Sequence, residues 1–416
     1  MSKLALYGGS AVKTTPFGTG RRFGQAELDY LAEALEQNSL FYWRGTMVKR
    51  FLARFAELYD MPYAVATSSG TASLHVAVGA LDIAPGEEVI TSPITDAGTY
   101  IGILYQQAIP VFADLDPHSY NMTAASIERV ITPRTRAIMV VHLAGNPADM
   151  DPILELARKH NLLVIEDCAQ SYEAFYHGRR AGTMGDIGCF STNDFKHIST
   201  GDGGMVLMRD ETLYHRALRF ADKNYQRLPS AETLRNADRL APNYRMTELQ
   251  GAVGLAQLER LEGICARRSE LGERLSAGIR DLPGIHVPHV QEGCRSSYWF
   301  YMLRLDPEVA GVDRQTFSDA LKAEGIPNSP GYIPAVVYAA NLFQNQTAFA
   351  TGHLPFELAP SAVPRYAPGS CPEAEAILKS AVRLTINEFY TDSDIDDMIM
   401  AIRKVCDHFR RSPLSS

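Results

Sequence analysis

The sequence lacks any apolar run that approaches the roughly 20 residues of a membrane-spanning helix, and residues 1–9 lack the long apolar core of a secretory signal. It carries no excess of positive charge either. The formal net charge is −8 over 416 residues, the wrong sign for a protein whose main partner is nucleic acid or an anionic membrane. Internal repeats and low-complexity segments are also missing. We therefore expect a globular, cytoplasmic protein with a small-molecule partner.

Cysteine is sparse, and its spacing matches no metal-binding pattern. The six cysteines are scattered along the chain, with no pair at metal-ligand spacing. Cys168 and Cys189 lie in apolar, strand-like runs and are expected to be buried thiols. We expect reduced cysteines and no bound metal.

Predicted strands and helices alternate through the first half of the chain. This order implies a mostly parallel sheet covered by helices on both faces. Such sheets bind ligands at the carboxyl ends of their strands, so we expect the functional residues just after the strands. The expected strands are residues 63–67, 88–91, 109–114, 135–143, 162–167, 186–191 and 204–208, and the expected helices are 23–37, 47–59, 70–81, 97–106, 123–131 and 150–160.

The second half has no chemical motif of its own. One long amphipathic helix, residues 249–279, is expected to carry the chain from a large domain to a smaller one. A strand at 297–305 and helices at 314–325, 373–382 and 391–410 follow, with irregular cover at 343–372. The length of 416 residues is too great for one compact core, which also favours two domains.

Small residues follow the first of these strands. Ser69, Gly70 and Thr71 open a helix there, where free backbone N–H groups and the helix dipole favour a phosphate group. An ordinary N-cap explains the same residues, because Ser and Thr are preferred at that position. Both interpretations stay open on this segment alone.

Two more candidates follow later strands. Asp167 ends the strand at 162–167, where a buried acid needs a partner such as a protonated ring nitrogen, or else serves as an N-cap. Lys196 lies between the strands at 186–191 and 204–208. In an apolar pocket a lysine loses its proton more easily, as a Schiff-base lysine must, whereas a surface lysine on a hairpin is the alternative. The phosphate turn, the acid and the lysine, in this order, are typical of pyridoxal phosphate (PLP) enzymes of the aspartate-aminotransferase fold.

Nearly the whole chain resembles one family, the DegT/DnrJ/StrS sugar aminotransferases. The resemblance implies a three-layer αβα large domain with a mostly parallel mixed sheet, residues 1–262, and a smaller C-terminal α+β domain, residues 263–416. Two segments, 165–171 and 180–183, most resemble aminotransferases acting on cyclitol ketones. The motifs that carry the resemblance are Ser69-Gly70-Thr71-Ala72-Ser73-Leu74, Glu166-Asp167-Cys168-Ala169-Gln170-Ser171, Phe190-Ser191 through Lys196 to Gly201-Asp202-Gly203-Gly204, and Asn243-Tyr244-Arg245-Met246-Thr247-Glu248-Leu249-Gln250.

The resemblance also implies a role for each matching residue. Lys196 is expected to form the Schiff base with PLP and to move protons, and Asp167 to pair with the pyridine nitrogen. Gln170 would contact the phenolic oxygen of the ring. The phosphate would be bound by Gly70, Thr71, Ser191 and, from the neighbouring subunit of a homodimer, Asn243.

Asp96 departs from the family pattern. The family places an aromatic or histidine ring against the cofactor face, and Asp96 falls at that position in Ser92-Pro93-Ile94-Thr95-Asp96-Ala97-Gly98-Thr99. An acid cannot stack on the ring. Either Tyr100 or another group covers the ring, or Asp96 contacts the amino donor or the substrate.

Weaker candidates complete the predicted site. Arg44 is a candidate for binding an acidic group of the substrate, and Tyr332 for contacting the substrate from the smaller domain. His142, Asn146 and His197 are candidates for lining the pocket, although a lone histidine is more often a packed or solvated residue.

The predicted function is transfer of an amino group from glutamate or glutamine to a keto-sugar, nucleotide-linked, or to a keto-cyclitol. One alternative is a sugar dehydratase on the same fold, although that kind of member carries histidine in place of the lysine. The other is a regulatory protein that binds a sugar phosphate without turnover.

Overall fold

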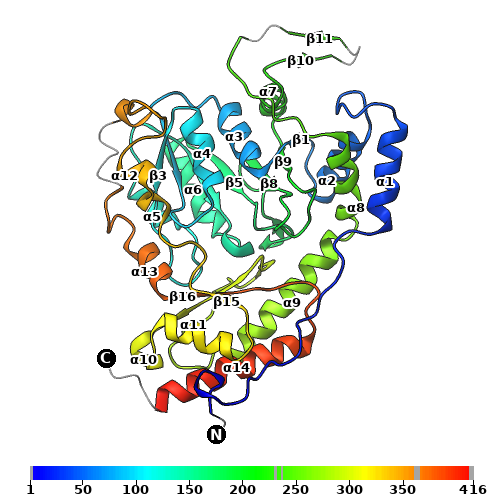
Figure 1. The fold of residues 1–416 in the computed structure, drawn as a ribbon. Coiled ribbons are helices and arrows are strands. Elements are labelled where there is room, and N and C mark those ends of the chain that lie inside the picture. The colour runs from blue at the N-terminus through cyan, green and yellow to red at the C-terminus, as the bar shows by residue number, and fades with distance from the viewer. Residues whose placement is uncertain (1–2, 229–231, 236–237, 360–365, 412–416) are drawn as a thin grey trace.

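A seven-stranded sheet lies at the centre of the computed structural model, which describes residues 3–228, 232–235, 238–359 and 366–411 (Figure 1). Its strand order is β1-β9-β8-β5-β4-β2-β3. β9 runs antiparallel to β1 and β8, and all other neighbours are parallel, so the predicted mostly parallel sheet is confirmed. The strands are β1 (Tyr63–Thr67), β2 (Glu88–Thr91), β3 (Ile109–Phe112), β4 (Thr135–Val141), β5 (Leu163–Asp167), β8 (Ile187–Ser191) and β9 (Gly204–Met208).

Helices cover both faces of this sheet, as predicted. Ile165 and Val206 point to one face and pack beneath α3 (Gly70–Ala80), α4 (Ala97–Tyr105) and α7 (Glu211–Ala221). Met205 and Leu207 point to the other face, toward α1 (Gln25–Glu36), α2 (Met47–Leu58) and α8 (Glu248–Leu258). Val164 shares that second face with α5 (Ala124–Glu128) and α6 (Met150–His160). Period-2 alternation along the strands separates the two cores.

A second, smaller sheet is antiparallel and packs with helices, as expected for an α+β domain. Its order is β12 (Ile285–His286), β14 (Tyr301–Leu305), β16 (Ala381–Leu384) and β15 (Asn328–Ser329). The helices α9 (Leu261–Ile279), α10 (Pro307–Ala310), α11 (Arg314–Ala323) and α14 (Asp392–Arg411) pack around it. Leu4, beside the short helix η1 (Ala5–Tyr7), lies in the same core, and both chain ends lie at this end of the molecule (Figure 1). The boundary at residue 262 stays a prediction.

Short elements connect and cover the two sheets. A hairpin of β10 (Gln226–Arg227) and β11 (Thr233–Leu234) projects from the large domain (Figure 1). β6 (Phe175–Tyr176), β7 (Arg179–Arg180) and β13 (Cys294–Arg295) form a three-stranded sheet. None of the described helices is long and apolar enough to cross a membrane. The remaining elements are η2 (Leu143–Gly145), η3 (Val337–Ala339), α12 (Asn341–Gln344), η4 (Phe356–Leu358) and α13 (Pro372–Ser380).

The cover predicted at 343–372 packs on the large sheet. Phe343 and Phe356 lie in the same core as Phe112 of β3. This segment contains the turns of α12 and η4 between irregular stretches, and its residues 360–365 lie outside the described part of the chain. The segment therefore extends the large domain, although it follows the small-domain helix α11 in the sequence.

The single long helix predicted at 249–279 is wrong, because the chain breaks it between α8 and α9. Gln257 is buried there, and its Nε2 donates to Arg22 O (2.8 Å) and to Glu27 Oε1 (2.7 Å). Arg260 Nη2 also donates to Arg22 O (2.9 Å). These contacts hold the end of α8 against the segment before α1, while α9 turns away to pack on α14. Apolar periodicity alone does not reveal such polar contacts.

Two boundaries in the small domain were also predicted wrongly. The helix expected to reach Val382 ends at Ser380, and Ala381 begins β16, which pairs with β14 and β15. The strand expected from Ser297 begins only at Tyr301, because the backbone leaves the extended conformation at Tyr298, which has a φ of +41°. In both places partners distant in sequence decide the conformation.

We predict that Glu248→Ala lowers the free energy of unfolding by about 2–4 kcal/mol, because two buried N–H groups lose their acceptor. Glu248 is fully buried and accepts hydrogen bonds from Met47 N (2.7 Å) and Val48 N (3.2 Å) at the start of α2. Denaturant unfolding followed by circular dichroism measures the change. Glu57→Ala on the exposed side of α2 is the control and should leave the unfolding midpoint almost unchanged. Equal effects of the two substitutions would contradict this role of Glu248.

Candidate active site

Asp167 lies at the carboxyl end of β5, on the face covered by α3 and α4. Alternation along the strand places it on the side of Ile165 and turns Glu166 to the opposite face. Its side chain is buried, with Thr99 Oγ1 donating to Oδ2 (2.8 Å) and Ala169 N donating to Oδ1 (3.1 Å). Burial raises the pKa of Asp167, and these two donors together with Lys196 oppose the shift only in part. A cationic ligand beside this carboxylate would offset the remaining cost.

Lys196 lies on the connection between β8 and β9. Two contacts fix its backbone: Lys196 N donates to Asn193 O (2.9 Å), and Lys196 O accepts from Arg22 Nη2 (2.6 Å). The residue is only 9% exposed. Burial lowers the pKa of Lys196 to about 8, although the carboxylates of Asp167 and Asp96 raise it. The predicted buried amine is therefore present, with Asp167 as an electrostatic neighbour, and the surface-hairpin alternative is wrong.

Gly70, Thr71 and Ser191 come together at the start of α3. A Cβ at Gly70 would lie 2.4 Å from Ser191 Cβ, so only glycine allows this approach of helix and strand end. A Cβ at Gly98 would lie 2.7 Å from Thr71 Oγ1, which places the start of α4 beside the same turn. Ser69 also caps α3, since its Oγ accepts from Ala72 N (3.0 Å). Ser69 is therefore an N-cap, with the hydroxyls of Thr71 and Ser191 nearby, and phosphate binding at this turn stays a prediction.

Gln170 and Tyr332 are in direct contact through their side chains. Gln170 Oε1 accepts from Ala144 N (2.8 Å), so the amide nitrogen faces the other way and donates to Tyr332 Oη (3.3 Å). Burial raises the pKa of Tyr332, and the carboxylates of Asp96 and Asp167 raise it further. This places the phenol in the electrostatic field of the two acids.

Asp96 caps α4, with its Oδ1 accepting from Gly98 N (2.9 Å). The side chain is exposed and contributes to the electrostatics of Lys196, Asp167 and Tyr332. Tyr100, the alternative ring, instead packs edge-on against Phe343 at 5.1 Å. Asp96 is thus an exposed acid close enough to Lys196, Asp167 and Tyr332 to affect their charges.

Arg44 and Asn243 both lie on the surface of the chain. Asn243 is exposed and forms an isolated bridge with Asp222, beside the hairpin. Arg44 is also exposed and lines a surface hollow with Lys223, Arg235 and, near Asn243, Arg245. Neither residue has a described contact with Lys196 or Asp167. The predicted roles of Arg44 and Asn243 therefore stay predictions.

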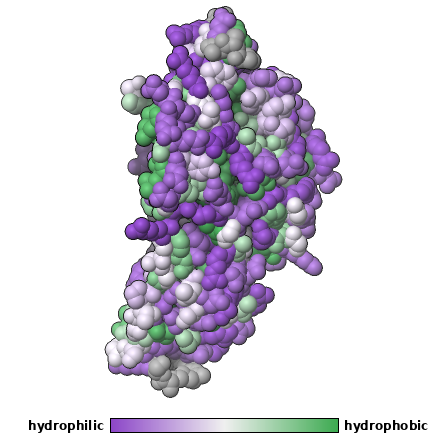
Figure 2. All heavy atoms as spheres, turned by 90° about the vertical axis from the view of Figure 1, so that its right-hand side faces the viewer, coloured by the Kyte–Doolittle hydropathy of each residue, from purple (hydrophilic) through white to green (hydrophobic). Residues whose placement is uncertain are grey.

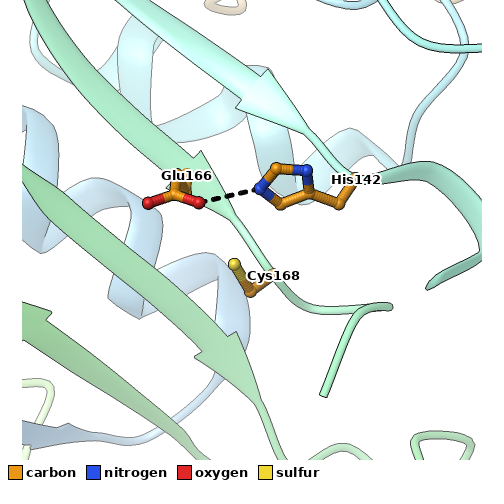
Figure 3. A group of neighbouring side chains, drawn as sticks. All are labelled: His142, Glu166 and Cys168. Atoms are coloured by element: carbon orange, nitrogen blue, oxygen red, sulfur yellow. Dashed lines mark hydrogen bonds and ion pairs between the residues drawn. The ribbon is translucent and has the colours of Figure 1, made fainter. Parts of the chain in front are cut away.

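His142, Glu166 and Cys168 form a buried cluster at the carboxyl ends of β4 and β5 (Figure 3). His142 Nδ1 accepts from Ala148 N (3.0 Å), so Nε2 carries the proton and donates to Glu166 Oε2 (2.9 Å). The Glu166 carboxylate also accepts from three backbone N–H groups, those of residues 182, 184 and 185. Burial raises the pKa of Glu166, but these hydrogen bonds outweigh it and hold the pKa below its ordinary value. Since both ring nitrogens of His142 and both carboxylate oxygens of Glu166 are already paired, we assign the cluster a structural role.

The other pocket candidates are also held by the protein. Asn146 Nδ2 donates to His289 O (2.9 Å) and to Ser119 O (3.3 Å). His197 Nε2 lies 3.0 Å from Ser297 O, and burial keeps the pKa of this ring well below its ordinary value. Both residues therefore act as neutral, packed groups.

Thr99 and Trp299 are site residues that the sequence did not reveal. Thr99 donates to Asp167, and Trp299 places its ring centroid 3.8 Å from Lys196 Nζ. One hydroxyl among several near Asp96 carries no distinguishing signal, and Trp299 lies at the start of a predicted strand 103 residues after the lysine.

The residues present fit PLP. A buried acid with a raised pKa suits a protonated pyridine nitrogen, and a buried lysine with a lowered pKa suits covalent attachment. The crowded Gly70–Ser191 turn suits a phosphate that needs close backbone approach. These three features lie at adjoining strand ends of one sheet.

A family profile, individual relatives and a solved structure all match this chain. Residues 22–403 match the profile of the DegT/DnrJ/EryC1/StrS aminotransferase family. A protein of Streptoalloteichus tenebrarius assigned as an L-glutamine:3-amino-2,3-dideoxy-scyllo-inosose aminotransferase is 39% identical, over 78% of this chain and 79% of its own. The GDP-perosamine synthase of Caulobacter vibrioides is 34% identical, over 91% and 95%. A solved aminotransferase from Psychrobacter cryohalolentis has a TM-score of 0.84 at 30% identity, covering 95% of this chain and 100% of that one.

Lys196 should react with an amine reagent in a pH-dependent way that reports its lowered pKa. The neutral amine is the reactive form, so acetylation of the cofactor-free protein should rise with pH to a midpoint near pH 8. Exposed lysines, with ordinary pKa values near 10.4, should still be rising there. Competitive labelling with acetic anhydride and peptide mass spectrometry measures each midpoint. In Asp167→Asn the Lys196 midpoint should fall, because the acid raises that pKa; a midpoint near pH 10 contradicts the buried setting.

Proposed function

The chain belongs to the DegT/DnrJ/EryC1/StrS aminotransferase family, and we propose that it transfers an amino group from glutamate or glutamine to the ketone of a nucleotide-linked sugar or a cyclitol. The observation that carries this proposal is the buried Lys196 amine, with its pKa lowered to about 8, beside the buried Asp167. A group with such a pKa can both accept and donate a proton near neutral pH.

The family is PLP-dependent, and PLP supplies the electron sink that stabilises a carbanion next to nitrogen. In our proposal Lys196 binds the cofactor covalently and then moves the proton at the reacting carbon. Asp167 holds the pyridine nitrogen protonated, and Thr99 fixes that carboxylate. The Gln170 amide, already oriented by Ala144, donates to the phenolic oxygen. Gly70, Thr71 and Ser191 bind the phosphate.

We further propose a homodimer in which Asn243 completes the phosphate site of the partner subunit. Asn243 is exposed in the single chain and has no described contact with Gly70, Thr71 or Ser191. Large apolar side chains are also left exposed at Leu28, Leu35 and Leu240, with Leu240 97% accessible. The face that carries α1 and α2 is mostly hydrophilic but gathers hydrophobic side chains near its middle (Figure 2). Burial of such side chains would favour association.

Two acceptor classes remain in the proposal, and each has support. The relative with 39% identity bears the name of a cyclitol aminotransferase, which favours a keto-cyclitol. The hollow beside Asn243 favours a phosphorylated acceptor, since Arg44, Lys223 and Arg235 pair with no carboxylate in the described part of the chain. In a dimer with shared sites these cations would offset the charge of a nucleotide diphosphate.

The rival functions are weaker for this chain. The dehydratases of this fold replace the lysine by histidine, and here Lys196 is present. Binding without turnover leaves the lowered pKa of Lys196 without a purpose. Release of a 2-oxo acid from glutamate or glutamine with a keto-sugar acceptor would exclude such a regulatory role.

Purified protein should be yellow, and Lys196→Ala should remove the visible absorbance because the covalent attachment is lost. Lys159→Ala is the matched control, since that amine lies on the surface and pairs with Glu128. It should retain the band. An unchanged visible spectrum in Lys196→Ala would falsify the assignment of the lysine.

Mixing two inactive variants tests the shared site. Lys196→Ala and Asn243→Ala dimers should each have little activity, and after subunit exchange about a quarter of the sites should be intact, because half of the dimers are hybrids with one complete site. Transaminase activity of the exchanged mixture measures this recovery. No recovery, with exchange confirmed by mass spectrometry, would contradict donation of Asn243 to the partner.

A further inference from the structure

Trp299 lies against the amine that the proposed reaction uses. Its ring centroid is 3.8 Å from Lys196 Nζ, and the indole Nε1 donates to Phe195 O (2.6 Å), the residue before the lysine. The residue is half-buried, so part of its surface remains accessible. None of the proposed contacts with PLP uses this ring.

The strained backbone of Tyr298, the residue before Trp299, fixes the position of the indole. Tyr298 has a φ of +41°, a conformation that a bulky residue rarely adopts. Its ring stacks on Tyr301 at 5.8 Å and packs so tightly on α9 that a Cβ at Gly272 would lie 2.5 Å from it. Trp299 N then donates to Ala144 O (2.9 Å). Strain that persists beside a reactive amine points to a functional constraint.

Hydrogen bonds through Ala144 link Trp299 to Gln170 and Tyr332. Ala144 uses its N–H to orient Gln170 and its carbonyl to hold Trp299. Tyr332 accepts from Gln170 and places its ring edge-on to the indole at 5.9 Å. Gln170, Tyr332 and Trp299 therefore form one continuous surface beside Lys196.

We propose that Trp299 is the surface on which the ring of the acceptor lies, and that it selects six-membered polyol rings. This rests on the proposed function: the ketone carbon must come within reach of Lys196 Nζ, roughly 3–4 Å, for the proton to move. An indole 3.8 Å from that nitrogen then meets the neighbouring ring carbons. The C–H face of a pyranose or cyclitol packs well on a π face, while its hydroxyls remain free for polar groups.

The proposal separates the two halves of the reaction. Glutamate and glutamine are short and acyclic, and they have no ring to lay on the indole. Loss of Trp299 should therefore weaken the acceptor half-reaction and spare the donor half-reaction. A residue that only supports the fold would affect both halves alike.

The test uses the full-length holoenzyme with the substitution Trp43→Phe. The chain has only two tryptophans, so this substitution leaves Trp299 as the single source of tryptophan fluorescence. Trp299→Leu and Trp299→Phe are compared with that background. Stopped-flow absorbance follows the donor half-reaction with glutamine or glutamate alone. The acceptor half-reaction then uses scyllo-inosose and GDP-4-keto-6-deoxymannose as probes.

In Trp299→Leu the donor rate constant should stay within about twofold, whereas kcat/KM for the reacting acceptor should fall at least about tenfold, mainly through KM. Trp299→Phe, which keeps an aromatic face, should recover most of the loss. A second readout needs no turnover and uses Trp299 emission in the cofactor-free protein. The emission should fall almost completely when PLP is added. In a separate sample without PLP, the emission should change when the acceptor is added.

Three results would overturn the proposal: an unchanged acceptor KM in Trp299→Leu, an equal loss in both half-reactions, or Trp299 emission that responds neither to PLP nor to either acceptor. These results differ from those expected if the proposed aminotransferase function is wrong. In that case the Trp43→Phe enzyme itself would lack the visible band and the donor half-reaction. An emission change on adding an acceptor that is not turned over still supports the proposal.

Discussion

Lys196 and Asp167 are both buried and attract each other electrostatically, and the rest of the site depends on the balance between their charges. Burial lowers the pKa of Lys196 and raises the pKa of Asp167, so both charged forms are disfavoured. Their mutual attraction opposes both shifts but does not cancel them. The pocket is thus tuned for a reactive amine and for a ligand that brings positive charge to the acid. Both needs are met by PLP with a protonated ring nitrogen.

Glu166 and Asp167 at the end of β5 have different hydrogen-bond partners and different roles. Glu166 turns away from the pocket and is fully paired with His142 and three backbone N–H groups, so it fixes the strand end and the loop at 182–185. Asp167 turns into the pocket and has only Thr99 and Ala169 as donors. A satisfied acid provides rigidity, and an under-satisfied one remains available for a ligand.

Local pattern singled out Gly70, Asp167 and Lys196 as candidates, because each lies at or just after the end of a predicted strand, and the resemblance to a known family assigned their roles, which stay predictions. Local pattern was not enough for Thr99 and Trp299, whose roles arise from packing between distant elements. The break between α8 and α9 depends likewise on the buried amide of Gln257, which periodicity does not register. The role of Asn243 depends on a second chain, so its place in the site remains a prediction.

The central claim is that Lys196 carries the cofactor. Reduction of the purified enzyme with sodium borohydride fixes a pyridoxyl group on whichever lysine holds PLP, and peptide mapping by mass spectrometry then locates it. The account predicts the modification on the peptide that contains Lys196, with stoichiometry rising in step with the visible absorbance before reduction. A pyridoxyl group on another lysine, or on none in a yellow preparation, would contradict the account.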